Sequence, residues 1–137
     1  CNNNFDVVFI DGMHQVEYVI NDFNNSVKHL NKNGKILLDD IIPLNLDEQK
    51  KIPTKHYYDD GVLKTSVPWT GDVWKFLYHI LLNYREFVTF NYFYNINSRG
   101  VAVLEIKETF HIEITDIEAI NNYSYIDDFE KYMSFFR

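Results

Sequence analysis

The stretch Phe5-Asp-Val-Val-Phe-Ile-Asp-Gly-Met-His14 decides the fold of this chain, together with Gly34-Lys-Ile-Leu-Leu-Asp-Asp40. Each is a short apolar run, rich in β-branched and aromatic residues, that ends abruptly in acid. Near-continuous apolar runs of this kind are typical of strands that are buried on both faces of a parallel sheet. We therefore expect two buried strands, over residues 6–10 and 35–38.

The segment between these strands has the period of an amphipathic helix. Its apolar residues recur at spacings of three and four, at Val16, Val19, Ile20, Phe23, Val27 and Leu30. The stretch Asn31-Lys-Asn-Gly34 supplies a helix stop that tolerates left-handed backbone. A right-handed crossover makes the two strands parallel and places their carboxyl ends at one edge of the sheet, where ligands of open α/β sheets bind.

Acidic side chains and one imidazole follow these two strands. Asp11 and His14 come after the first strand, and Asp39 and Asp40 after the second. Mg²⁺ prefers carboxylate oxygens as ligands, and a histidine can exchange a proton near neutral pH. The pattern predicts a divalent-cation site with a proton-transfer step at this edge of the sheet.

A long connection and a second helix come next. Residues 41–71 contain all three prolines and no sustained period, which in a compact domain indicates a functional or disordered loop. A helical stripe follows over residues 73–84, with Thr70 or Asp72 as its N-cap.

The last third of the chain predicts a hairpin and a C-terminal extension. Strand-like runs over residues 87–94 and 101–106 are joined by an Asn/Gly turn, which predicts an antiparallel hairpin. In the extension, residues 107–137, we expect an extra strand over 110–114 and a short helix over 125–136 that is capped by Ser124.

Composition indicates one globular unit. With 137 residues, 46% of them hydrophobic, the chain can bury one core, so we expect a single partial domain over residues 1–137. A net charge of −7 with no basic cluster argues against nucleic acid and anionic membranes as partners. No signal peptide and no membrane-length apolar run is visible, so a cytoplasmic protein is expected. Because the chain begins with Cys1 and enters a strand almost at once, we expect it to be the tail of a longer protein.

The order strand, helix, strand, long loop, helix, hairpin resembles the carboxyl-terminal half of a class I S-adenosylmethionine-dependent methyltransferase. The motifs that carry this resemblance are D-G-x-H at Asp11 to His14, the G-x-I-L-x-D-D pattern at Gly34 to Asp40, and Pro68-Trp-Thr-Gly-Asp-Val-Trp-Lys75. The resemblance covers residues 5–106. It implies an α/β fold with a Rossmann-like methyltransferase sheet, in which two parallel strands and their crossover helix precede a helix and an antiparallel hairpin.

The resemblance also implies a metal site and a base. Metal-dependent O-methyltransferases of small molecules and sugars hold Mg²⁺ with an acid after one strand and an acid pair after the next. By position these ligands are Asp11, Asp39 and Asp40. A histidine three residues after the first acid serves some of these enzymes as general base, which implies that role for His14.

Cofactor and acceptor contacts are implied in the same way. Asp11, Gly12 and Met13 are expected to touch the edge of S-adenosylmethionine, while Trp69 and Asp72 are candidate contacts to a hydroxylated small molecule or sugar. Each assignment has a structural alternative. Asp11-Gly12 is also an ordinary turn, the acid pair also solvates a strand end, and His14 and Asp72 also cap helices.

Residues 1–137 contain no counterpart of the glycine-rich cofactor loop of such enzymes. We therefore expect the chain on its own to be inactive and the activity to belong to a longer protein. Two other interpretations stay open. One is a degenerate methyltransferase-like module with a binding or assembly role, forming a homo-oligomer through an exposed sheet edge. The other is a different Rossmann-like nucleotide enzyme, such as a sugar-nucleotide transferase, which the terminal hairpin fits poorly.

Overall fold

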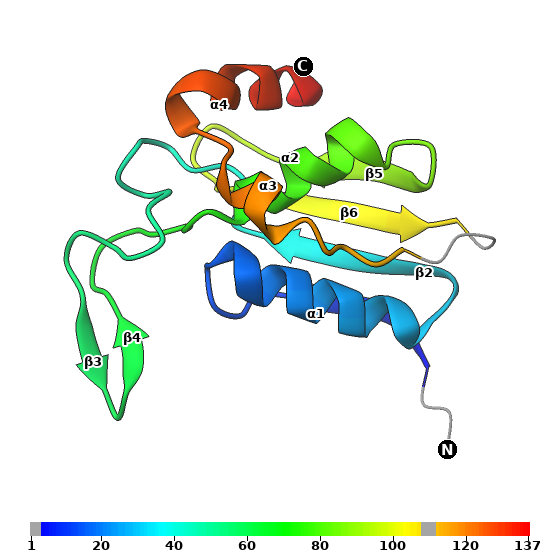
Figure 1. Ribbon diagram of the computed structural model, residues 1–137, viewed down its shortest axis with the longest axis horizontal. Coiled ribbons are helices and arrows are strands. Elements are labelled where there is room, and N and C mark those ends of the chain that lie inside the picture. The colour runs from blue at the N-terminus through cyan, green and yellow to red at the C-terminus, as the bar shows by residue number, and fades with distance from the viewer. Residues whose placement is uncertain (1–3, 108–111) are drawn as a thin grey trace.

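The computed structural model of the protein describes residues 4–107 and 112–137 (Figure 1). Its elements confirm the predicted strand–helix–strand unit, the second helix and the hairpin. In chain order they are β1 (Phe5–Ile10), α1 (Val16–Lys28), β2 (Leu30–Asp39), β3 (Tyr57–Asp59), β4 (Val62–Lys64), α2 (Val73–Asn83), β5 (Val88–Phe93), β6 (Val101–Ile106), α3 (Ile117–Asn121), α4 (Tyr125–Met133) and the 3₁₀ helix η1 (Ser134–Phe136).

A mixed sheet with the order β1-β2-β6-β5 forms the centre of the described molecule. β1 and β2 are parallel and are joined by α1, while β6 runs antiparallel to both β2 and β5. Helices α1, α2 and α3 pack against one another on one face of this sheet (Figure 1). The mixed sheet and its crossover helix agree with the predicted α/β class and place the ends of β1 and β2 at one edge.

Only one face of the sheet is buried, which corrects the expectation of strands buried on both faces. The helix-covered face carries Ile10, Ile36, Leu38, Ala102 and Leu104, all among the buried residues of the core. On the opposite face of β1, Phe5, Val7 and Phe9 are 51%, 57% and 55% exposed. Successive side chains of a strand alternate between faces, and no element in residues 4–107 or 112–137 covers this second face.

The junction between α1 and β2 differs from the expected helix stop. α1 ends at Lys28, and Leu30 begins β2, so the predicted stop residues Asn31 to Gly34 lie within a strand. They form an irregularity there, because Phe5 pairs with Leu30 while Val7 pairs with Lys35. Asn33 has a φ of +61°, so the left-handed backbone expected of this stretch serves a bulge within the strand.

The long segment 41–71 contains a small hairpin that the sequence analysis did not expect. β3 and β4 pair across a turn in which Asp60 and Gly61 have φ values of +49° and +76°. The segment is fastened to the sheet by Glu48, which is 6% exposed and whose Oε1 lies 2.7 Å from Nη2 of Arg99 in the hairpin turn. The segment therefore has a fixed course against the body, at least around Glu48.

The C-terminal extension packs onto α2 with aromatic side chains. Ser124 caps α4 as predicted, because its Oγ accepts a hydrogen bond from the Asp127 amide. Tyr132 is fully buried and its hydroxyl donates to the Ile41 carbonyl at 2.6 Å. Residues 110 and 111 of the expected extra strand lie outside the described residues, and residues 112–114 are not in a strand. Helix α3 had no counterpart in the sequence prediction.

Candidate functional site

Three of the side chains expected at the sheet edge do meet there. Asp11 follows β1, Asp40 follows β2, and the parallel pairing of Ile10 with Leu38 brings the two strand ends together. His14 Nε2 lies 3.0 Å from Asp40 Oδ2 and 3.8 Å from Asp11 Oδ1. One ligand atom from each of the three residues lies within 4.8 Å of the others, so they could hold a metal ion together.

The imidazole of His14 is fixed by its other nitrogen. Nδ1 lies 2.7 Å from the carbonyl oxygen of Trp69, and a carbonyl can only accept, so Nδ1 carries a proton. Nε2 then turns its lone pair toward the carboxylates. The Trp69 indole lies beside the ring, with the two ring centroids 5.0 Å apart. A histidine whose second nitrogen donates to a backbone carbonyl is typical of metal sites and of general bases.

Asp40 is the most perturbed acid of this group. Burial is the largest cause that raises the pKa of Asp40, to about 6, and the charges of Asp39 and Asp11 raise it further, against the opposing effect of His14. His14 Nε2 and the Asp40 carboxyl lie 3.0 Å apart and form an ion pair when Nε2 also carries a proton. A bound cation could take the place of that proton.

Asp39 takes a different position from the one expected of it. Its Oδ1 accepts a hydrogen bond from the Asp40 amide at 2.9 Å, and it is not part of the cluster that the described residues form. The backbone of Asp40 is left-handed, with a φ of +56°. The arrangement therefore combines Asp11, Asp40 and His14, where the sequence suggested Asp11, Asp39 and Asp40 as ligands with His14 as the base.

Gly12 and Met13 connect this cluster to the open side of the molecule. A hollow of about 650 Å³ is lined by the end of β1, by Asp11 and Gly12, and by residues of α1 that include Asp22. A Cβ placed on Gly12 would lie 3.5 Å from Asp22 Oδ2, which is ordinary contact. Met13 is half-buried, and its carbonyl accepts a hydrogen bond from the Gln15 amide. Of the three residues expected to touch the cofactor, Asp11 and Gly12 line this hollow, and Met13 is not among its lining residues.

The two candidate acceptor residues lie in different surroundings. Trp69 is half-exposed beside His14, and its indole Nε1 donates to the Lys50 carbonyl at 2.6 Å. Asp72 is only 1% exposed, and its Oδ1 accepts from the Val16 amide at 2.9 Å. Asp72 therefore faces the interior instead of a substrate. It occupies the expected N-cap position of α2, but its side chain makes no bond to that helix and caps α1 instead.

A second hollow, of about 330 Å³, lies in the long segment next to Trp69. It is lined by Asn45, Asp47, Glu48, Pro53, Thr54, Lys55, Val67 and Pro68. All of these residues belong to the segment 41–71, in which only Trp69 was predicted as a site residue. Glu48, Arg99 and Lys51 carry no motif either, so no sequence signal would have identified them.

Comparison with known proteins gives two findings. Residues 2–41 match the family model of a methyltransferase domain, which supports a methyltransferase domain in this protein. A stretch of 38 residues, 28% of the chain, is 55% identical to the uncharacterized protein R132 of Acanthamoeba polyphaga mimivirus. That stretch spans 17% of the length of this relative. No helix in the described parts of the chain is long and apolar enough to cross a membrane.

Proposed function

We propose that the chain is the catalytic-side part of an S-adenosylmethionine-dependent O-methyltransferase that acts, with a divalent cation, on a hydroxylated small molecule or sugar. The methyltransferase-domain match over residues 2–41 supports the reaction class. The observation that carries the proposal is the placement of His14 Nε2, 3.0 Å from Asp40 and 3.8 Å from Asp11, at the ends of two parallel strands.

The donor set suits a hard divalent cation. Asp11 and Asp40 offer carboxylate oxygens, as Mg²⁺ and Mn²⁺ prefer, and they lie close enough that the charge of Asp11 raises the pKa of Asp40. Asp39 would join them only by releasing the Asp40 amide. A bound cation would increase the acidity of an acceptor hydroxyl that chelates it.

His14 would act as the general base. With the cation held by Asp11 and Asp40 and the imidazole neutral, its Nε2 lone pair would face the cluster and could accept the proton of an acceptor hydroxyl. The Trp69 carbonyl, which holds the Nδ1 proton, would stabilise the positive charge that then forms on the ring. The half-exposed indole of Trp69 offers a flat apolar surface for a sugar ring, and Asp11 and Gly12 line the hollow proposed for S-adenosylmethionine, with Met13 following them in the chain. The site would also have to align the acceptor oxygen with the methyl group of S-adenosylmethionine.

The metal part is tested by calorimetric titration of Mn²⁺ into the chain and two variants. Asp40→Asn keeps the shape of the side chain and removes its charge, so we expect saturable binding to be lost. Asp47→Asn removes an exposed carboxylate that pairs with Lys50 at 2.7 Å, away from the cluster, and should bind as the parent does. Equal binding by the parent and Asp40→Asn, or no saturable binding by the parent, would refute the metal assignment.

A binding or assembly role is the second candidate, and the open face of β1 favours it. Phe5, Val7 and Phe9 are each more than half exposed, and the outer edge of β1 pairs with no other described strand. Light scattering over a concentration series tests this role. Self-association that Phe9→Asp abolishes would support it, and a monomer at every concentration would contradict assembly through this edge.

A further inference from the structure

His14 and the two residues after it each form a hydrogen bond with a residue far away in the sequence. His14 binds the Trp69 carbonyl, Gln15 donates from Nε2 to the Lys51 carbonyl at 2.8 Å, and the Val16 amide donates to Asp72. These partners are 36 to 56 positions away in the sequence. The orientation of the imidazole therefore depends on how the two ends of the long segment are fastened.

Asp72 fastens one end of the long segment by capping α1, although it stands at the start of α2. Val16 is the first residue of α1, so its amide has no acceptor within the helix. Gln15, at the N-cap position, makes no side-chain cap, and Asp72 Oδ1 accepts the Val16 amide in its place. A carboxylate at this point also interacts favourably with the positive end of the helix dipole. Asp72 thus fixes the backbone two residues after His14.

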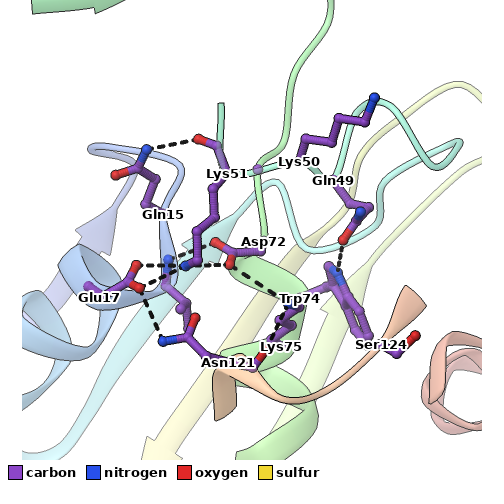
Figure 2. A network of polar contacts seen from close by, with 12 residues as sticks. Gln15, Glu17, Gln49, Lys50, Lys51, Asp72, Trp74, Lys75, Asn121 and Ser124 are labelled. Carbon is purple, nitrogen blue, oxygen red and sulfur yellow. Dashed lines mark hydrogen bonds and ion pairs between the residues drawn. The ribbon is translucent and has the colours of Figure 1, made fainter. Parts of the chain in front are cut away.

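Lys51 is what allows the Asp72 charge to be buried. Figure 2 shows its Nζ between two carboxylates, 2.6 Å from Asp72 Oδ2 and 2.8 Å from each oxygen of Glu17. Lys75 lies farther away, with Nζ 4.0 Å from Asp72, and donates to the Asn121 carbonyl at 3.2 Å. A buried carboxylate that loses its nearest partner is strongly disfavoured, so the position of Asp72 depends mainly on its pairing with Lys51.

We propose that Asp72 and Lys51 are positioning residues, which hold the His14 imidazole on the Trp69 carbonyl so that Nε2 faces Asp11 and Asp40. The functional meaning of this inference rests on the role proposed for His14. The positioning itself can be observed without any metal or methyl donor, because it concerns the Nδ1 proton.

The test follows the Nδ1 proton of His14 by NMR in the chain labelled with ¹⁵N histidine, with His14→Gln to assign the signal. In Lys51→Met the Asp72 charge keeps only its 4.0 Å contact with Lys75, and we expect exchange of this proton to become about tenfold faster, from the size of helix-capping effects. Removing the charge as well, in Lys51→Met/Asp72→Asn, leaves an amide oxygen for Val16 and should restore exchange to the parental rate. Lys50→Met is the matched control and should not change the exchange rate, because Lys50 is the neighbour of Lys51 but its exposed side chain pairs with Asp47.

The proposal would be overturned if the Nδ1 proton of Lys51→Met exchanged at the parental rate. It would also be overturned if the double variant exchanged this proton as fast as Lys51→Met does. Should Lys51→Met fail to fold, Asp72→Ala against Asp72→Asn gives the same contrast, since only asparagine keeps an acceptor for the Val16 amide. Mn²⁺ titration of the same variants separates the two proposals. Proton exchange that responds as expected in a chain that binds no Mn²⁺ would uphold the positioning and refute the metal site.

Discussion

Gly71 offers the sharpest test of how the site is built. Its φ is +60°, and a Cβ added there would lie 1.5 Å from the His14 carbonyl oxygen, where real Cβ atoms keep at least 3.0 Å. Because the obstacle is backbone and cannot rotate away, Gly71→Ala must separate the two chain segments. Left-handed backbone in a residue other than glycine costs about 1–2 kcal/mol, and the overlap adds to this, so we expect a loss of more than about 4 kcal/mol.

Gly61→Ala is the matched control for this prediction. Gly61 also has a left-handed backbone, with a φ of +76°, but nothing lies within 4 Å of an added Cβ. We expect it to lose about 1 kcal/mol from the backbone alone. Both variants are compared with the parent by urea denaturation, where the midpoint reports the free energy of unfolding. If Gly71→Ala lost no more stability than Gly61→Ala, the close approach of Gly71 to His14 would be refuted.

Three further predictions concern the fastening of the fold. Tyr132→Phe should lose about 1–2 kcal/mol in urea denaturation, because it leaves the buried Ile41 carbonyl without its donor; a neutral result would contradict that bond. Burial raises the pKa of Glu48, but the hydrogen bond from Arg99, the Leu44 amide and the Arg99 charge together outweigh it and hold the pKa below the ordinary 4.5. Its stabilisation is thus present above that value and lost as pH falls through the lower folded-state pKa, so Glu48→Gln should flatten the acid limb of a stability–pH curve. Ser124→Ala should lose about 1 kcal/mol through its N-cap, and an unchanged urea midpoint would exclude the cap.

The elements with a clear period were predictable from sequence. The stripe of Val16, Val19, Ile20 and Phe23 gave α1, and these four residues are buried in the structure. The terminal hairpin followed from its Asn/Gly turn. The β3–β4 hairpin was missed although Asp60-Gly61 is a common hairpin turn, because the strands on either side are short and their side chains mostly exposed.

The sequence pattern did not predict correctly which acidic residues form the cluster with His14. Successive residues of a strand point to opposite faces, so in a regular strand only one of Asp39 and Asp40 can point toward the cluster. The backbone departs from regular strand geometry at Asp40, whose φ is +56°, and this turns that carboxylate toward His14 while Asp39 binds the Asp40 amide. Contacts such as Lys51 with Asp72 depend on the course of the long segment, which carries no period to predict it from.

The dependence of the site on residues 51 and 69–72 has a consequence for how the molecule folds. The bond from His14 to Trp69 closes a loop of 55 residues, and loop closure of that length costs about 3.5 kcal/mol of chain entropy beyond a constant. We therefore expect the β5–β6 hairpin, closed by a short turn, to form earlier in refolding than the candidate site. Proteolytic cleavage at the exposed β3–β4 turn would leave every site residue in place in the folded molecule. Once unfolded, however, the two fragments would have to meet by diffusion, and recovery of the site would depend on protein concentration.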